Sequence, residues 1–216
     1  MKRITLMLVT VLVFALFAEP AFASRKVIAL TFDDGPSRNN PKVVEILRSH
    51  DASATFFFVG KRMTKGAFDP TSLLEVGEVG NHTWKHSNSH PWKKLSYAAA
   101  KKEIRDTNTR IFGRTGQKCV WFRSVGLQKS KASDRAIKSA GMRNVGGVLV
   151  EDWGRRSGNK SSAIKKRVIR KASKSGSILI LHETNKETIK ALPGILDWYH
   201  DHGYKVVTVS QLKNRK

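Results

Sequence analysis

Short apolar runs alternate with longer amphipathic segments along most of the chain. The runs typical of buried strands lie at 27–32, 54–59, 78–82, 120–122, 144–150, 177–181 and 205–209. Segments with a helical spacing of apolar residues lie between them, at 41–50, from Leu73 onward, and at 95–112, 133–140, 161–173 and 188–200. Strands that alternate with helices favour a parallel sheet with crossover helices. About seven or eight such units without a long linker indicate an α/β fold of one domain, a compact and incomplete (β/α) barrel.

The first residues have the pattern of a secretory signal peptide. Two basic residues precede an apolar run at 4–17, and an Ala-x-Ala cleavage pattern ends at Ala23. The run is shorter than the roughly 20 residues that a membrane span requires, which favours a cleavable leader over the alternative, an uncleaved anchor. We therefore expect a signal peptide at 1–23, a single domain at 24–216, and export to the periplasm or the extracellular side of the cell envelope.

The chain carries one cysteine, Cys119, so it cannot form an intramolecular disulfide or a zinc site of several thiolates. Any metal would therefore be held mainly by His, Asp or Glu. We expect Cys119 itself to be a small buried apolar side chain.

The chain is strongly basic, with 40 Lys and Arg against 17 Asp and Glu and a formal net charge of +23. The excess is concentrated at 85–174, where 24 basic residues face 5 acidic ones. Such a charge suggests an anionic partner. Export makes nucleic acid an unlikely one, and it leaves anionic envelope polymers or lipid headgroups. The alternative is a solvated face that aids solubility.

Two adjacent carboxylates, Asp33 and Asp34, follow the first apolar run in the motif TFDDGP. Buried carboxylates cost free energy unless a metal, protons or cations compensate them. Neighbouring residues on an extended chain point in different directions, so the two can have different roles. The alternative is an ordinary solvated Asp-Asp-Gly-Pro turn.

Two histidines four residues apart, His82 and His86, lie in the motif GNHTWKH. Two imidazoles at this spacing can reach one metal. With a carboxylate from TFDDGP they complete three protein ligands, the number in a catalytic zinc site that keeps a position open for water. His90 is a rival ligand with poorer spacing, and a pair of surface histidines is the alternative.

TFDDGP followed by GNHTWKH resembles the polysaccharide deacetylase family, which is carbohydrate esterase family 4 with its NodB homology domain. The resemblance runs from about 27 to 212 and includes the closing segment 191–212. It implies a distorted (β/α) barrel, a divalent metal that is usually zinc, and an acetylated polysaccharide as substrate. It also implies hydrolysis of acetyl groups from amino sugars, as in peptidoglycan or chitin, or from sugar hydroxyls, as in xylan.

The resemblance also implies a role for each residue that matches the family. Metal ligands are matched by Asp34, His82 and His86, the general base by Asp33, the general acid by His182, the arginine that orients the base by Arg123, and the carboxylate that tunes the acid by Asp152. Substrate contacts are matched by Trp153 in the groove, Ile180 at the acetyl methyl group, where the family usually has leucine, and the backbone N–H of Val125 at the oxyanion.

The chain departs from the family pattern in three places. The Arg-Pro-Pro-aromatic-Gly loop is replaced by Arg123-Ser124-Val125-Gly126, which is one residue shorter and lacks proline. The first Asp of an Asp-x-x-Asp-Trp motif is replaced by Leu149, and the segment between Pro70 and His82 is about one helical turn shorter. The residues that match the metal ligands, the base and the acid are retained, so we expect activity, and a divergent substrate or a modest rate would be no surprise. The alternative is a non-catalytic binding protein on the same fold.

Overall fold

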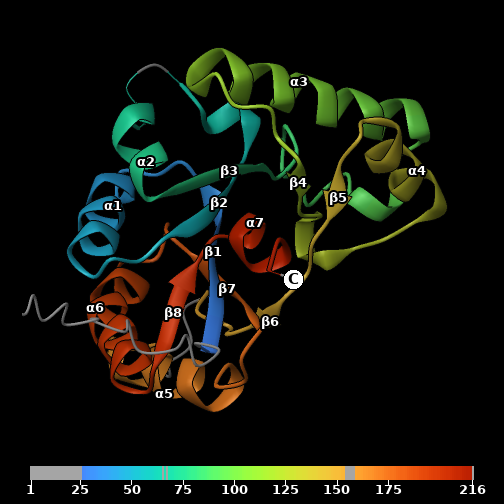
Figure 1. Cartoon of the computed structure of the whole chain (residues 1–216). Helices are drawn as coiled ribbons and strands as arrows, with labels where there is room; N and C mark the ends of the chain where they lie inside the picture. The colour runs from blue at the N-terminus through green and yellow to red at the C-terminus, as the bar shows by residue number, and fades with distance from the viewer. Residues whose placement is uncertain (1–25, 65, 67, 154–158, 216) are drawn as a thin grey trace, which may run out of the picture.

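Eight strands form one sheet in the centre of the molecule, and the paired strands run parallel to one another (Figure 1). The strands are β1 (Lys26–Gly35), β2 (Ala54–Phe58), β3 (Gly77–Asn81), β4 (Trp121–Phe122), β5 (Arg143–Asn144), β6 (Val148–Leu149), β7 (Ile178–His182) and β8 (Tyr204–Val207). Their order is β5-β4-β3-β2-β1-β7-β6. Both β8 and β2 pair with the same edge of β1, β8 with its first half and β2 with its second half. The predicted single-domain α/β barrel is confirmed.

This computed structural model describes residues 26–64, 66, 68–153 and 159–215. The predicted signal peptide at 1–23 lies outside these residues. Among the described residues, no helix is both long enough and apolar enough to span a bilayer.

Helices surround the sheet in two groups (Figure 1). The helices are α1 (Asn40–Ser49), α2 (Pro70–Val76), α3 (Tyr97–Thr115), α4 (Lys131–Ser139), α5 (Ser161–Lys171), α6 (Lys186–Asp201) and α7 (Val209–Lys213), with single turns η1 (Gly60–Arg62), η2 (Trp92–Lys94) and η3 (Val125–Leu127). The main core lies between the sheet and α1, α2, α5 and α6, and a second apolar cluster lies between β4, α3 and α4.

Local sequence explains the long elements. Nearly all of β1 and all of β2 are buried, as expected for strands covered on both faces. At the start of α3, the side chain of Ser96 accepts a hydrogen bond from the N–H of Ala99, and Gly116 ends the helix in the left-handed region with φ 69°. In α5, Ile164 and Val168 face the core, as the amphipathic pattern predicted.

The single strand predicted at 144–150 is wrong, because the segment is divided between the two edges of the sheet. β5 pairs with β4 at one edge, and β6 pairs with β7 at the other. Gly146 and Gly147 lie between them. A Cβ on Gly147 would be 2.5 Å from the carbonyl oxygen of Ile178, so no other residue fits there without movement. The segment therefore crosses the opening between the two edges.

The last strand ends earlier than predicted, at Val207, and the strand assignment for Val209 is wrong. Thr208 begins α7 with a capping box, in which its side chain and that of Gln211 each accept a hydrogen bond from the other's backbone N–H. Val209 is then buried inside the barrel against Ala29, Phe57 and Trp121. The short helix thus fills the barrel interior.

The polar residues singled out in the sequence gather at the carboxyl ends of the strands. Asp33 and Asp34 lie near the end of β1, and His182 is the last residue of β7. His82 follows β3, and Arg123 follows β4. In β/α folds this end of the sheet carries the chemistry.

Candidate active site

Three side chains converge at the carboxyl ends of β1 and β3. Asp34, His82 and His86 each place one ligand atom within 4.8 Å of the others. The Oδ1 atom of Asp34 lies 2.9 Å from Nε2 of His86 and 3.6 Å from Nε2 of His82. That oxygen is buried, and no described group donates a hydrogen bond to it in good geometry. One carboxylate oxygen and two imidazole nitrogens that converge in this way fit a divalent metal ion.

The protonation of the three groups also suits a metal. Nδ1 of His82 lies 2.7 Å from the carbonyl oxygen of Arg123, which can only accept, so the proton is on Nδ1 and Nε2 presents a lone pair to Asp34. Burial lowers the pKa of His82 and favours its neutral ring. Burial alone would raise the pKa of the Asp34 carboxyl, but the neighbouring His86 and His82 outweigh it and hold that pKa well below its usual range.

The loop between the two histidines has a backbone shape that other side chains hold in place. Thr83 and His86 have φ values of 67° and 49°, in the left-handed region that non-glycine residues rarely adopt. The carboxylate of Glu103 on α3 accepts hydrogen bonds from the N–H of Trp84 and of the residue after it, both at 2.8 Å. The side-chain oxygen of Asn81 accepts from the N–H of Thr83 at 2.9 Å. These bonds compensate the backbone strain and orient the histidines.

Asp33 forms a buried ion pair with Arg123. Nη1 of Arg123 lies 2.7 Å from Oδ1 of Asp33, and the arginine side chain is 0% exposed. The guanidinium also donates to the hydroxyl of Thr31 and to the carbonyls of Val145 and Gly146, so the segment that crosses between β5 and β6 helps to hold it. A buried arginine with all these partners fixes the orientation of Asp33 and compensates the charge of its carboxylate.

His182 forms a second pair with Asp152. Nδ1 of His182 lies 2.8 Å from Oδ1 of Asp152, whose Oδ2 accepts from the N–H of His182 and the hydroxyl of Thr188. Burial lowers the pKa of His182, but the hydrogen bond and charge of Asp152 outweigh burial, and the pKa is raised above its ordinary value. Nε2 is therefore the free nitrogen of a ring that holds a proton more readily than usual.

Strand register brings the two pairs together. Asp33 on β1 is directly opposite His182 on β7, and neighbouring strands lie only about 5 Å apart. The site therefore combines a carboxylate held by arginine, an imidazole held by a carboxylate, and a set of three metal-ligating groups beside them.

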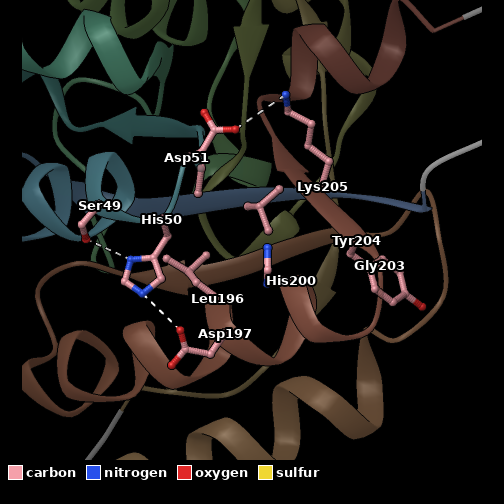
Figure 2. Close-up of a pocket in the computed structure, with 11 residues that line it drawn as sticks. Ser49, His50, Asp51, Leu196, Asp197, His200, Gly203, Tyr204 and Lys205 are labelled. Atoms are coloured by element: carbon pink, nitrogen blue, oxygen red, sulfur yellow. Dashed lines mark hydrogen bonds and ion pairs between the residues drawn. The ribbon is translucent and has the colours of Figure 1, made fainter. Parts of the chain in front are cut away.

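A separate cavity of about 610 Å³ lies at the other end of the sheet, where β2 and β8 begin (Figure 2). His50 and Asp197 line it, with Nε2 and Oδ1 3.4 Å apart. Among the described residues, only Asp34, His82 and His86 bring three ligand atoms close together. We therefore place the candidate active site at the carboxyl ends of the strands.

Comparison with known proteins agrees with this geometry. The model of the family described as polysaccharide deacetylase matches residues 22–145. A peptidoglycan-N-acetylglucosamine deacetylase of Bacillus cereus is 33% identical over 201 residues, which cover 89% of this chain and 91% of the relative. The chain belongs to the polysaccharide deacetylase family.

Solved structures of other polysaccharide deacetylases share the fold. The solved chain of the peptidoglycan deacetylase PdaC of Bacillus subtilis superposes with a TM-score of 0.79 at 30% identity, covering 88% of this chain and 91% of the solved one. A family 4 acetyl xylan esterase of Clostridium thermocellum, solved in complex with a cobalt ion, superposes with a TM-score of 0.78 at 30% identity, covering 87% and 90%.

The remaining residues expected from the polysaccharide deacetylase resemblance have different environments. Trp153 is 45% exposed, and its ring lies 5.2 Å from that of His182, edge to face. Val125 is buried at the start of η3, and Ile180 is buried next to Gly147. His90 is not part of the converging group. Contacts of Trp153, Ile180 and Val125 with substrate remain predictions.

Three further residues at this polysaccharide deacetylase site were missed in the sequence. Glu103 holds the histidine loop, Arg62 donates a hydrogen bond to the carbonyl of Asp34, and Glu183 is fully buried beside the segment after Asp34. The carboxylate of Glu183 accepts from the N–H of Ser37 at 2.6 Å, and burial raises its pKa to about 7. Each acts through a contact distant in sequence, which no short motif reveals.

Proposed function

We propose that this protein is a metal-dependent hydrolase that removes acetyl groups from N-acetylated amino sugars of peptidoglycan. The observation that carries the proposal is that Asp33 and His182 are register partners on the neighbouring strands β1 and β7, beside the three converging ligand atoms. Similarity to peptidoglycan deacetylases supports the substrate class. One carboxylate and two imidazoles favour Zn²⁺ as the metal.

The proposed mechanism assigns one task to each pair. A divalent ion held by Asp34, His82 and His86 would supply Lewis-acid polarisation and a more acidic water. Asp33 accepts the proton of the attacking water, while Arg123 holds the carboxylate in position for it. His182 donates its proton to the departing amine nitrogen, and Asp152 keeps the imidazole protonated for that step.

The same proposal places the smaller substrate contacts. The backbone N–H of Val125 donates to the oxyanion. Trp153, which is half-exposed beside His182, lies against the sugar, and Ile180 lies near the acetyl methyl group. We further propose that the leader at 1–23 exports the protein and that the basic region at 85–174 attracts anionic envelope polymers or lipid headgroups.

Replacing Asp152 with asparagine is expected to shift the pH profile. Asp152 raises the pKa of His182, so the acid form survives to higher pH, and removal of the charge makes His182 lose its proton earlier as pH rises. The alkaline limb of kcat/KM should move to lower pH, with a loss of about 10- to 100-fold on that side. Glu151→Gln, which removes a neighbouring carboxylate paired with Lys171 on the surface, is the matched control. An unshifted alkaline limb would rule out this role for Asp152.

The proposed activity is tested by acetate release from three substrates. The metal-loaded protein should release acetate from peptidoglycan faster than from chitin oligomers or acetylated xylan, and chelation should stop the release. Faster release from xylan would favour the O-acetyl esterase alternative, which the similarity to an acetyl xylan esterase supports. No release from any substrate would favour a non-catalytic binding protein, although binding alone requires neither the Asp33 pair nor the His182 pair.

A further inference from the structure

A basic groove runs along one face of α3 and begins beside the candidate active site. Its lining includes four cationic side chains, one acidic one and a tryptophan: Lys102, Arg105, Arg110, Arg114, Asp106 and Trp84. The four cationic residues on α3 recur at intervals of three to five positions, and Asp106 lies next to Arg105, so they share one side of the helix. We call this surface the α3 groove.

The groove is continuous with the metal-ligating loop. Trp84 lies between the two ligand histidines in the sequence, and its carbonyl accepts a hydrogen bond from the N–H of Lys61 at 3.1 Å. The next residue on η1, Arg62, reaches back to the carbonyl of Asp34. The groove therefore starts at the loop that carries His82 and His86.

Two of the arginines are held in place without being neutralised. The guanidinium of Arg110 lies 5.5 Å from the ring centre of Trp84 and donates to the carbonyl of Met63 at 3.2 Å. The guanidinium of Arg114 lies 5.5 Å from the ring centre of Phe68. No described carboxylate pairs with either, whereas Asp106 pairs with Lys102 and Arg105. Held guanidinium groups with donors to spare favour carboxylate ligands, because a carboxylate accepts two parallel N–H bonds.

We propose that the α3 groove binds the acidic peptide that peptidoglycan carries on its glycan chain, so that the enzyme prefers peptide-bearing strands. This inference rests on the proposed function. The groove from Lys102 to Arg114 spans twelve residues of helix, about 18 Å. An extended peptide of five residues spans about 17 Å, so one peptide matches the row of cations in length as well as in charge.

The test compares two substrates and two pairs of substitutions. Peptidoglycan strands are first stripped of phosphate polymers with hydrogen fluoride, and half are then freed of peptides with an amidase. The variant Arg110→Gln/Arg114→Gln removes two charges from the groove. The variant Lys166→Gln/Arg170→Gln removes two charges from α5, on the opposite side of the molecule from α3 (Figure 1). Acetate release gives kcat and KM for each combination, and sedimentation with the strands gives binding directly.

The wild type should have a KM on peptide-bearing strands about 3- to 10-fold below that on peptide-free strands, as expected for two exposed ion pairs. The groove variant should lose this difference with kcat unchanged, and the α5 variant should keep it. If the groove variant is less stable to heat, Arg114→Gln alone should shift KM in the same direction by a smaller factor.

Three results would overturn the inference: equal KM values on the two strands, an equal effect of the α5 variant, or an advantage that depends on the phosphate polymer instead of the peptide. A wild type that releases no acetate from either strand contradicts the proposed function. In that case binding decides the inference separately, because the groove variant must still lose its preference for peptide-bearing strands.

Discussion

Replacing Asp34 with asparagine, or His82 with alanine, is expected to abolish metal uptake and acetate release together. Each change removes one of the three proposed protein ligands, and turnover should fall by about 10³-fold or more because the Lewis acid and its activated water are lost. Asparagine suits position 34 because the backbone there has φ 70°, which asparagine tolerates better than alanine. Metal content after dialysis and acetate release from peptidoglycan are the two measurements.

The matched control for these ligand variants comes from the cavity at the other end of the sheet. His50→Ala and Asp197→Ala remove the same residue types from a pair that does not form part of a metal-ligating group (Figure 2). They should leave metal content and activity unchanged. Chelation should lower the melting temperature of the wild type and of the controls but not of the ligand variants, because only a protein that binds the metal is stabilised by it. Full activity in Asp34→Asn or His82→Ala would contradict the assignment.

The convergence of Asp34, His82 and His86 could be predicted because the three residues lie in two short motifs. Asp34 directly follows a run of apolar residues, and His82 and His86 are four residues apart. Parallel strands bring their carboxyl ends to one edge of the sheet, so both motifs were expected to meet there. Apolar patterning was equally sufficient for β1, β2 and α5, where burial of the regular apolar positions determines the structure.

Other parts of the site could not be predicted because long-range contacts determine them. The segment 144–150 is apolar enough to be taken as one strand, yet it crosses between the two edges of the sheet, and Gly147 fits only because no Cβ meets the carbonyl of Ile178. That crossing supplies the carbonyls that hold Arg123. Glu103 contacts the histidine loop from a helix that begins eleven residues after it, at Tyr97. Neither partner contains a pattern that identifies the other.

The two aspartates of the first motif also have different surroundings that adjacency in sequence does not reveal. Asp34 has φ 70° and faces the histidines, whereas Asp33 faces Arg123. The left-handed backbone at Asp34, where the register of β1 against β2 shifts, turns its side chain away from that of Asp33. We therefore expect the two aspartates to have separate roles, with Asp34 binding the metal and Asp33 accepting a proton.

Asp33→Asn is expected to keep metal uptake and lose turnover. The amide has the shape of the carboxylate and can still accept a hydrogen bond from Arg123, but it cannot accept the proton of the attacking water. Turnover should fall by about 10²- to 10⁴-fold, the usual contribution of a general base. Stability should fall by about 1–3 kcal/mol, because the fully buried guanidinium loses the charge of its partner.

Metal content decides between two roles for Asp33. Its Oδ2 atom lies 4.0 Å from Nε2 of His82, so a ligand role is the geometric alternative to a proton acceptor. A variant that binds the metal with wild-type affinity and releases no acetate supports the acceptor, whereas a variant that loses metal and turnover together would make Asp33 a fourth ligand. Glu45→Gln, which removes a carboxylate paired with Lys42 on the exposed side of α1, controls for the change of charge. The side chain of Arg123 contacts Asp33 and not Asp34, and four separate hydrogen-bond partners hold it there, so the arginine orients Asp33 alone, as the acceptor role requires.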